Sequence, residues 1–520
     1  MATNVNSLAS KVISQLFERD GCNLSNSKVA ALDYGLWPIH TLTHIQILRL
    51  CKDSGAEVLY SQNIIGHRPT YFFPYLGRRR KLITKLLIEA QILEYQLVQK
   101  GYRSIVLDNE AKAVLGQINQ IKTLAELKKI NFRGHPVGYT ISSTLVSQFR
   151  STDIRVGMLR SWAKKYFRAY VQGYQDALDL HQTHGYSAFV IFNGRFPSPR
   201  GASDYAKEKG LIVIAHDVEP AVPRFTFLRS RIHSPESAIE FQEVLESIKA
   251  KTPDLFKTTD YYSSRFDKTM PSIKVFTQKW TEESKVNLPK TPYVAIFSSS
   301  DHEHYSITPD RDFQDSQTQM EWLVRLTRIL LDDGLTVAVR IHPNAEISKR
   351  LIRDTWVNNF SKNSNFYIYT QESSMDSYFL AKNASIVVTT FSTIAAELAS
   401  MGKPVISTGY SLYQNFINLD RCNNTTDFLP LVRKMQSTEV SQERKLALMA
   451  GASRYGQFQA QRYFDFELTP LLSVLHNKEA ILPSITETYR QLRGKSRIEE
   501  FLVKVVFYFR YRILLLDSRR

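Results

Sequence analysis

The stretch SIVVTTFSTIAAELASMGKPVIS, residues 385–407, decides the fold. Its apolar, β-branched start is typical of a buried strand. The alanine-rich segment after Ser392 is typical of a helix that this serine caps. The sequence MGKP (401–404) then stops the helix, and a second apolar run follows. A strand, a helix and a strand in this order predict a parallel strand pair joined by a right-handed crossover.

The same alternation runs through the second half of the chain. Strands are expected in TPYVAIFSSSDHE (291–303, strand then loop), LTVAVRIHPN (335–344) and NFYIYT (365–370), and helices in MEWLVRLTRILLDDG (320–334) and MDSYFLAKN (375–383). Strictly alternating strands and helices predict a parallel, doubly wound sheet. A glycine ends the first of these helices, as is common.

The first half repeats this pattern less regularly. Strands are expected in KVAALDYG (28–35), AEVLYSQ (56–62), SIVLD (104–108), SAFVIFNGR (187–195) and LIVIAHDVEP (211–220), and helices near 40–55, 83–100, 111–130, 151–184 and 203–210. Residues 221–285 carry little pattern. The sequence therefore predicts an α/β protein with two Rossmann-like domains.

The length of 520 residues fits two domains. The best boundary is the polar link VNLPKTP (286–292), which holds two prolines. We expect an N-terminal domain over 1–285, a second domain over 290–475 and a C-terminal helical segment over 476–520.

The charge balance favours anionic partners. There are 67 Lys and Arg residues against 50 Asp and Glu residues, a formal net charge of +17. The three cysteines are far apart, so the sequence predicts neither a disulfide scaffold nor a structural zinc site, and a reducing, cytoplasmic compartment fits. No uncharged apolar run is long enough for a membrane span. These counts exclude a secreted disulfide-rich protein.

Six polar tips follow expected strands. Ligands bind beyond the carboxyl ends of strands in doubly wound sheets, which makes these tips the candidate site. They are YGLWPIH (34–40), NGRF (193–196), HDVEP (216–220), SSSDHE (298–303), RIHPN (340–344) and TTFST (389–393).

The TTFST tip suits a nucleotide. A helix that begins at Thr393 offers free backbone N–H groups to a phosphate. Glu397 lies one turn further on the same helix face, where its carboxylate could accept hydrogen bonds from a ribose diol. The alternative is that Ser392 only caps the helix and that Glu397 is solvated. Likewise, His342 either donates to a phosphate or is a satisfied histidine at a strand end.

These residues resemble motifs of GT-B glycosyltransferases of the bacterial capsule and surface-polysaccharide type, whose relatives include Kdo- and sialic-acid-transferase-like enzymes. The matching pieces in the second half are FSSSDHE (297–303), RIHPN (340–344) and residues 384–406. In the first half, LDYGLWPIH (32–40) and VIFNGRF (190–196) look like acceptor-domain loops. The resemblance implies two Rossmann-like domains facing a cleft, with a C-terminal helix that crosses back to the first domain.

The resemblance also implies how the donor is bound. A nucleotide-sugar, a UDP- or CMP-sugar, would bind to the second domain, with no metal and no permanently bound cofactor. The implied donor-binding residues are Ser299, Ser300, Arg340, His342, Pro343, Thr390, Ser392, Thr393 and Glu397. The sialyltransferase-like pattern of two acids and a glycine far upstream of the His-Pro pair has no counterpart in this chain.

An inverting sugar transfer needs a base that accepts the proton of the acceptor hydroxyl. The candidates lie in the first domain: Glu219, then Asp217, then His40. The alternative for each is a helix cap or a surface charge.

The acceptor-binding residues expected from the same tips are Gly35, Asn193, Gly194 and Arg195. An Asn-Gly pair lets the backbone approach a ligand, and Arg195 could bind an acidic group. A simple strand–turn is the alternative.

The leading function is therefore transfer of a sugar to a growing surface polysaccharide or lipid-linked glycan. The basic runs at 68–85 and 150–168 could bind the anionic inner face of the plasma membrane, and a solvated basic surface is the alternative. A CDP-alcohol polyol-phosphate transferase and a nucleotide-sugar 2-epimerase are alternatives on the same fold. A glycan- or nucleic-acid-binding protein is the non-enzyme alternative. The sequence shows no recognised nucleic-acid-binding motif, and no specific nucleic acid is expected.

Overall fold

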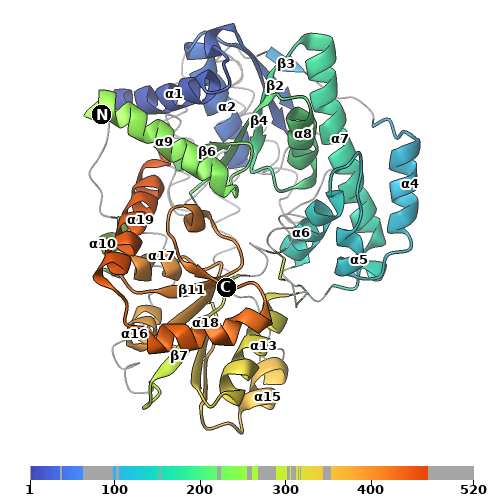
Figure 1. Ribbon diagram of the computed structural model, residues 1–520. Helices are drawn as coiled ribbons and strands as arrows, with labels where there is room; N and C mark the ends of the chain where they lie inside the picture. Colours follow the sequence, from blue (N-terminus) through green and yellow to red (C-terminus); the bar gives the residue numbers. More distant parts are fainter. Residues whose placement is uncertain are drawn as a thin grey trace, which may run out of the picture. The chain divides into compact units, whose positions relative to one another are not determined.

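The computed structural model contains two sheets with helices packed on them (Figure 1), which confirms the predicted α/β class. It describes residues 2–34, 38–62, 98–100, 105–149, 152, 154–219, 224–253, 261–267, 288–300, 305, 312–313, 316, 318–342 and 353–466. The described residues up to Phe464 belong to one compact unit. The C-terminal helical segment expected over 476–520 lies outside the described residues.

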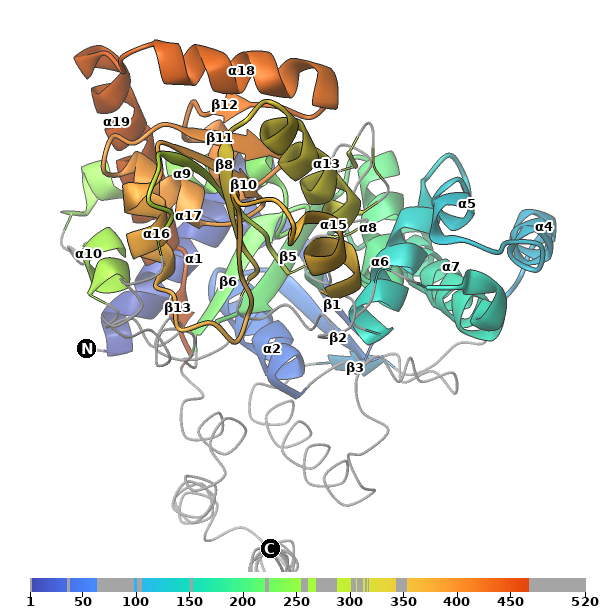
Figure 2. The ribbon, with the colours of Figure 1, turned by 90° about the horizontal axis from the view of Figure 1, so that it is seen from below.

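The first sheet has the strand order β13-β6-β5-β4-β1-β2-β3. Its strands are β1 (Lys28–Asp33), β2 (Glu57–Gln62), β3 (Val98–Lys100), β4 (Ala188–Phe192), β5 (Ile212–Val218), β6 (Arg224–Arg229) and β13 (Phe464–Asp465). The pairs β1–β2, β2–β3, β1–β4 and β4–β5 are parallel, and β5–β6 is antiparallel. Figure 2 shows the blue strands β1 and β2 and the green strands β5 and β6 of this sheet, and β4 lies between the two pairs in the strand order.

The order of this sheet reverses between β1 and β4. Strands β2 and β3 continue on one side of β1, whereas β4 and β5 continue on the other. Such a switch point leaves a crevice at the carboxyl ends of the two central strands, where doubly wound folds bind ligands. Tyr34 follows β1 at this edge, and Asn193 follows β4.

Helices cover the first sheet and extend beyond it. They are α1 (Ala2–Glu18), α2 (Pro38–Asp53), α4 (Asn109–Ile118), α5 (Leu124–Lys128), α6 (Val137–Phe149), α7 (Arg160–His184), α8 (Pro197–Glu208) and α9 (Pro235–Lys251), and the short helix α10 (Tyr261–Phe266) comes after them. Helix α2 contacts β1, β2, β4 and β5, and α8 contacts β4 and β5. Apolar residues of α2 are buried against the sheet, and polar ones also meet it: Thr41 donates to Asp33 on β1 at 2.6 Å, and the His44 ring lies 4.4 Å from that of His216 on β5.

Helices α7 and α8 lie side by side because two glycines let their backbones meet (Figure 1). A Cβ at Gly173 would lie 1.9 Å from the carbonyl oxygen of Ser198. A Cβ at Gly201 would lie 2.1 Å from that of Tyr170. No larger residue fits either position without separating the helices.

The second sheet has the order β12-β11-β10-β7-β8-β9 and is parallel at every pair. Its strands are β7 (Tyr293–Phe297), β8 (Thr336–Arg340), β9 (Phe366–Tyr369), β10 (Ile386–Thr390), β11 (Val405–Thr408) and β12 (Asp420–Arg421). The order reverses between β7 and β10, so this sheet too has a switch point. The stretch quoted first forms β10, a helix and β11, as predicted.

The helical segments of the second half are α13 (Gln319–Asp332), the π-helical turn η6 (Arg353–Val357), α15 (Asn358–Phe360), α16 (Ser377–Asn383), α17 (Ile394–Ala399), η7 (Leu412–Asn415), α18 (Thr425–Ser437) and α19 (Gln442–Gln461). Apolar side chains of α13 and α18 meet those of β7, β8 and β10 in one core, with Trp322 and Trp356 at its centre. This core fixes the positions of the strands whose carboxyl ends carry the candidate site.

Two expectations for the first half are wrong. Residues 105–108 form no strand, and Asp108 instead caps α4 by accepting a hydrogen bond from the N–H of Ala111 at 2.8 Å. Within the helix expected over 83–100, the described residues Val98–Lys100 form strand β3. Strand β6 and helix α9 arise in the region that carried little pattern. No helix in the described ranges is both long and apolar enough to cross a bilayer.

Candidate functional site

The serine-rich loop after β7 and the histidine after β8 come together at the carboxyl edge of the second sheet. Strands β7 and β8 are neighbours in register, so their ends leave the sheet side by side. The backbone N–H of His342 donates to Ser298 Oγ at 2.8 Å. Nδ1 of the His342 ring lies 3.2 Å from Ser300 Oγ. Two of the predicted donor-binding residues, Ser300 and His342, are therefore in direct contact.

Helix α13 fixes the backbone of this loop. The backbone N–H of Ser299 donates to Gln319 Oε1 at 2.6 Å, and Gln319 Nε2 donates to the carbonyl of Ser299 at 3.2 Å. The Ser299 main chain is therefore held by a side chain at the start of the helix. Pro343, the next predicted residue, lies outside the described residues.

The imidazole of His342 is neutral at pH 7. Burial, with the positive charge of Arg340, lowers the pKa of His342 to about 4. A neutral imidazole carries one N–H. If Ser300 donates to Nδ1, the proton sits on Nε2, which can then donate to a ligand.

Arg340 is held by contacts within the second half of the chain. Its Nε lies 3.3 Å from Ser377 Oγ, and its other nitrogens contact the carbonyl oxygens of Thr370 and, at 3.4 Å, Ser373. Burial lowers the pKa of Arg340 to about 10. These contacts link β8 to the segment before α16, so Arg340 also has a structural role.

The corner after β10 is tightly built. The hydroxyls of Thr390 and Thr408, at the ends of β10 and β11, lie 2.6 Å apart and are buried. Phe391 takes a positive φ of 59° at the turn. Helix α17 has only six residues, with Thr393 at its N-cap position, and the N–H of Ile394 donates to Ser392 Oγ at a long 3.5 Å. The cap expected from Ser392 is thus weak.

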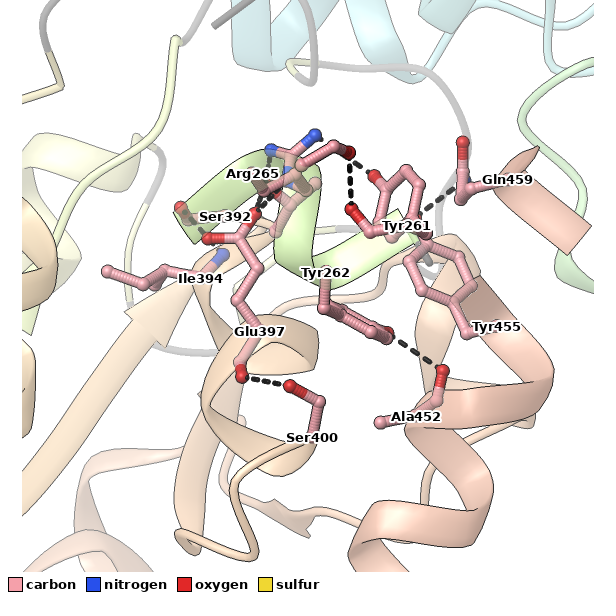
Figure 3. A network of polar contacts seen from close by, with 12 residues as sticks. Tyr261, Tyr262, Arg265, Ser392, Ile394, Glu397, Ser400, Ala452, Tyr455 and Gln459 are labelled. Atoms are coloured by element: carbon pink, nitrogen blue, oxygen red, sulfur yellow. Dashed lines mark hydrogen bonds and ion pairs between the residues drawn. The ribbon is translucent and has the colours of Figure 1, made fainter. Parts of the chain in front are cut away.

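Glu397 is buried and already paired (Figure 3). The residue is 3% exposed, so it is not a solvated charge. Arg265 Nε, from α10, lies 2.6 Å from Glu397 Oε1, and Thr393 Oγ1 donates to the same oxygen at 3.1 Å. The guanidinium also contacts Thr393 Oγ1 at 3.2 Å and the Tyr261 hydroxyl at 3.0 Å. A ribose at Glu397 would share this carboxylate with Arg265.

Arg265 is the main residue of this corner that sequence reasoning missed. It lies 132 residues before Glu397 in the chain. Burial alone would lower the pKa of Arg265, but the charge of Glu397 raises it above its ordinary value. The only sequence signal for Arg265 was its place after two tyrosines, in YYSSR (261–265), within a stretch that otherwise carried little pattern.

A second group of predicted residues meets at the carboxyl edge of the first sheet. Asn193 Nδ2, after β4, donates to Asp217 Oδ2 on β5 at 2.7 Å. Asn193 and Gly194 both have positive φ, and a Cβ at Gly194 would lie 2.9 Å from Arg231 Cγ. The predicted Asn-Gly turn therefore brings the backbone close to Arg231.

The two candidate acids differ in their surroundings. Burial raises the pKa of Asp217 to about 6, against the opposing hydrogen bonds from the Val218 N–H and from Asn193. Glu219 Oε2 instead lies 2.6 Å from Arg224 Nη2, in an ion pair. Asp217 is thus the carboxyl group whose charge can change near neutral pH.

Two further candidates from the first half of the chain, Arg195 and His40, are buried. Arg195 donates to Ser143 Oγ at 2.6 Å and Ser147 Oγ at 2.9 Å, both on α6. The His40 ring lies 3.9 Å from that of Phe192, and burial lowers the pKa of His40 well below its ordinary value. Gly35 lies outside the described residues.

A metal centre is not formed by the part of the chain that the structure describes: no three His, Cys, Asp or Glu residues there are arranged to hold an ion. The chemistry of the site, as described, lies in the His342–Ser300 pair, the Glu397–Arg265 pair and the Asp217 carboxyl group.

No family model matches the chain, and no curated protein matches it. Its fold is similar to several solved structures. One is the UDP-GlcNAc 2-epimerase of Methanocaldococcus jannaschii in complex with UDP-GlcNAc and UDP, with 10% identity over 83% of this chain and 98% of that chain and a TM-score of 0.29. Another is KpsC of Thermosulfurimonas dismutans, a β-Kdo 2,7 transferase, with 14% identity over 54% of this chain and 80% of that chain and a TM-score of 0.28.

A third is MurG of Acinetobacter baumannii, with 10% identity over 83% of this chain and 95% of that chain and a TM-score of 0.26. A Kdo transferase and a nucleotide-sugar 2-epimerase are thus among the similar structures. Because these TM-scores are low, the fold assignment rests on the strand orders and registers of the two sheets.

Proposed function

We propose that this protein is a glycosyltransferase that moves a sugar from a nucleotide-activated donor to a surface polysaccharide or lipid-linked glycan. The observation that carries the proposal is the contact of Ser300 with His342 at the ends of β7 and β8. These ends adjoin the switch point between β7 and β10, and parallel sheets bind nucleotides at such points.

In this proposal His342 binds the donor phosphate. Its Nε2–H donates to a phosphate oxygen while Ser300 holds Nδ1, so the ring need not titrate during the reaction. The donor is a UDP- or CMP-sugar. The nucleotide phosphate leaves with the electron pair of its bond to the anomeric carbon, and the hydrogen bond from His342 strengthens as negative charge develops there.

Asp217 is the proposed base. Its carboxylate accepts the proton of the acceptor hydroxyl, and the hydroxyl oxygen then forms a bond to the anomeric carbon. Its pKa near 6 leaves it mostly ionised at pH 7 yet basic enough to accept a proton. Glu219 is the weaker candidate because Arg224 already holds it in an ion pair.

A thermal-shift panel of UDP, CMP, CDP, GDP and ADP tests the donor site. One nucleotide at about 100 times its dissociation constant should add about 2.7 kcal/mol of stability. His342→Ala should lose this shift. His184→Ala, at a half-exposed position at the end of α7, should keep it and serves as the control. Absence of a shift with every nucleotide would contradict the proposal.

Product analysis separates transfer from the alternatives. A glycosyltransferase releases nucleotide only when an acceptor glycan is present and extends that glycan by one sugar. A 2-epimerase would convert the donor sugar without an acceptor, and a polyol-phosphate transferase would release CMP from a CDP-alcohol. The net charge of +17 supports an acceptor anchored at an anionic membrane surface, on the cytoplasmic side where nucleotide-sugars are made.

A further inference from the structure

Arg462 and Tyr463 lie where the chain returns to the first sheet, between α19 and β13. The ring of the following residue, Phe464, packs against Phe225 and Phe227 of β6 with centroid distances of 5.8 Å and 5.2 Å. This packing fixes Arg462 and Tyr463 beside the end of β6, although they are distant from it in sequence.

Two guanidinium groups share the ring of Tyr463. The guanidinium carbon of Arg462 lies 4.6 Å from the ring centroid, and that of Arg224, on β6, lies 5.8 Å from it. Arg462 Nη2 also donates to the Tyr463 hydroxyl at 2.6 Å. Tyr463 thus holds two positive groups near one another, an arrangement that repulsion disfavours unless negative charge lies between them.

Several N–H donors of these two arginines are buried and have no hydrogen-bond partner among the described residues. They are Nε and Nη1 of Arg462 and Nε of Arg224. Buried donors are nearly always paired, and leaving one unpaired is costly. The side chains themselves are partly exposed, so a ligand can reach them. A bound group with acceptor oxygens would satisfy these donors.

The local charge balance favours an anion. Arg224 is paired with Glu219, and the positive charges of Arg462 and Arg195 act on Asp217. Three guanidinium groups thus act on two carboxyl groups. One of these, Asp217, gives up its charge more readily than an ordinary aspartate because it is buried. A single anionic group would neutralise the excess.

We propose that Arg462 and Arg224 bind an anionic group of the acceptor, a carboxylate or a phosphate, beside Asp217. Guanidinium groups suit this role because their planar N–H donors match the oxygens of both anions. The site defines the substrate class of the proposed transferase. Only the identification of the bound anion as part of the acceptor rests on that proposed function, because binding itself needs no transfer. It makes an acidic or phosphorylated glycan end, rather than a neutral one, the acceptor.

Calorimetric titration of the full chain tests this site with three probes: a disaccharide ending in a uronic acid, its carboxyl-reduced neutral counterpart, and the neutral disaccharide carrying a phosphate at that position. We expect an anionic probe to bind about ten-fold or more tighter than the neutral one. The tighter of the two anionic probes identifies the group as carboxylate or phosphate. Equal affinity for the neutral probe, or no binding of either anionic probe, overturns the inference.

Variants then assign the binding to these arginines. Arg462→Gln should weaken the anionic probe about ten-fold and leave the neutral probe unchanged. The matched control is Arg454→Gln, an exposed arginine of α19 that lies 3.4 Å from Glu246, and it should bind as the parent does. Unchanged affinity in Arg462→Gln overturns the assignment. If Arg462→Gln fails to fold, Arg224→Gln takes its place with the same expected outcomes.

The nucleotide panel keeps the two proposals apart. A chain that binds a nucleotide but does not prefer anionic saccharides overturns this inference and leaves the transferase. A chain that prefers anionic saccharides in the Arg462-dependent way but binds no nucleotide keeps the anion site and overturns the transferase.

Discussion

The Arg265–Glu397 ion pair shows how much one long-range residue changes the interpretation of another. The sequence left two interpretations of Glu397 open: a carboxylate that binds the ribose of a nucleotide, or a solvated side chain. The structure buries Glu397 beside Arg265, which in turn donates to the Tyr261 hydroxyl (Figure 3). The Thr393 hydroxyl, at the start of the short helix, donates to the same carboxylate. A buried carboxylate needs such partners because water no longer solvates it.

Removing Arg265 should therefore destabilise the protein strongly. Arg265→Gln leaves the carboxylate of Glu397 buried without its cation and should lower the free energy of unfolding by about 3–5 kcal/mol in urea titrations. The control is Arg433→Gln, whose ion pair with Asp333 has an arginine side chain that is 62% exposed. It should leave the free energy of unfolding nearly unchanged, because solvent screens an exposed ion pair. Equal losses in both variants would show that the buried pair contributes no more than a surface pair.

Asp217 sets the expected pH dependence of transfer. The base acts only when ionised, so kcat/KM should rise about ten-fold per pH unit up to about pH 6, the pKa of Asp217, and level off above it. Asp217→Asn should abolish this rise of kcat/KM with pH together with most of the activity. Asn193→Ala removes a hydrogen bond that favours the ionised form of Asp217, so in this variant the rise should move to higher pH. A rise that survives in Asp217→Asn would assign the base to another group.

At this scale, sequence reasoning was strongest where strands are neighbours. The serines after β7 and His342 after β8 could be predicted to meet because consecutive parallel strands pair often. Arg265 and Arg462 could not be predicted as partners of Glu397 and Asp217, because these contacts join segments that only the tertiary fold brings together and a single charge carries no periodic signal. Arg224 lies close to Glu219 in the sequence, and the two meet because β5 and β6 pair in antiparallel fashion.

Among the elements, buried parallel strands were the most predictable. Continuous apolar, β-branched runs identified β1, β2, β4, β5 and the strands from β7 to β11. The shortest edge strands were not: β3 has three residues and β13 two, too few for a pattern, whereas the longer edge strand β9 was predicted. The run SIVLD (104–108) looked like a strand, but its Asp108 caps a helix, and the N-cap preference for aspartate outweighs a short apolar run.

Because α7 and α8 pack closely, we expect a methyl group added at Gly173 or at Gly201 to lower the stability of the protein. Gly173→Ala or Gly201→Ala puts a Cβ about 2 Å from a facing backbone carbonyl, so the helices must separate. Either variant should lower stability by about 1–3 kcal/mol in thermal or urea unfolding.

Gly116→Ala on α4 is the matched control, because its Cβ would meet nothing within 4 Å. It should be neutral or raise stability by up to about 1 kcal/mol through the higher helix propensity of alanine. If all three variants behave alike, the glycines act through helix propensity, and the close backbone approach has no energetic role.

For the molecule as a whole, the alternating pattern predicted two doubly wound sheets but not the order of their strands. Strand order depends on which crossover turns to which side, and no local residue encodes it. The resemblance implied a return to the first domain by the C-terminal helix, whereas in the described residues the chain returns earlier, at Phe464, through aromatic packing with β6. The domain bounds read from the sequence stay predictions.

Helix α19 packs against both halves of the chain. The Phe458 ring lies 6.1 Å from that of Phe241, on α9, and 5.4 Å from that of Phe416, which follows η7. Phe458 is fully buried, and the Tyr262 hydroxyl donates to the carbonyl of Ala452 on the same helix at 2.8 Å. The helix therefore contributes to the single compact unit that extends to Phe464.

Phe458→Ala should consequently destabilise both sheets together. Truncation of a buried phenylalanine costs about 3–5 kcal/mol, and the loss falls on a contact that both halves share. Hydrogen exchange should therefore show amides of β1–β5 and of β7–β11 losing protection by similar factors. Met449→Ala, at an exposed position of the same helix, should change neither. Loss of protection confined to one sheet would mean that the halves unfold independently and that α19 belongs energetically to one of them.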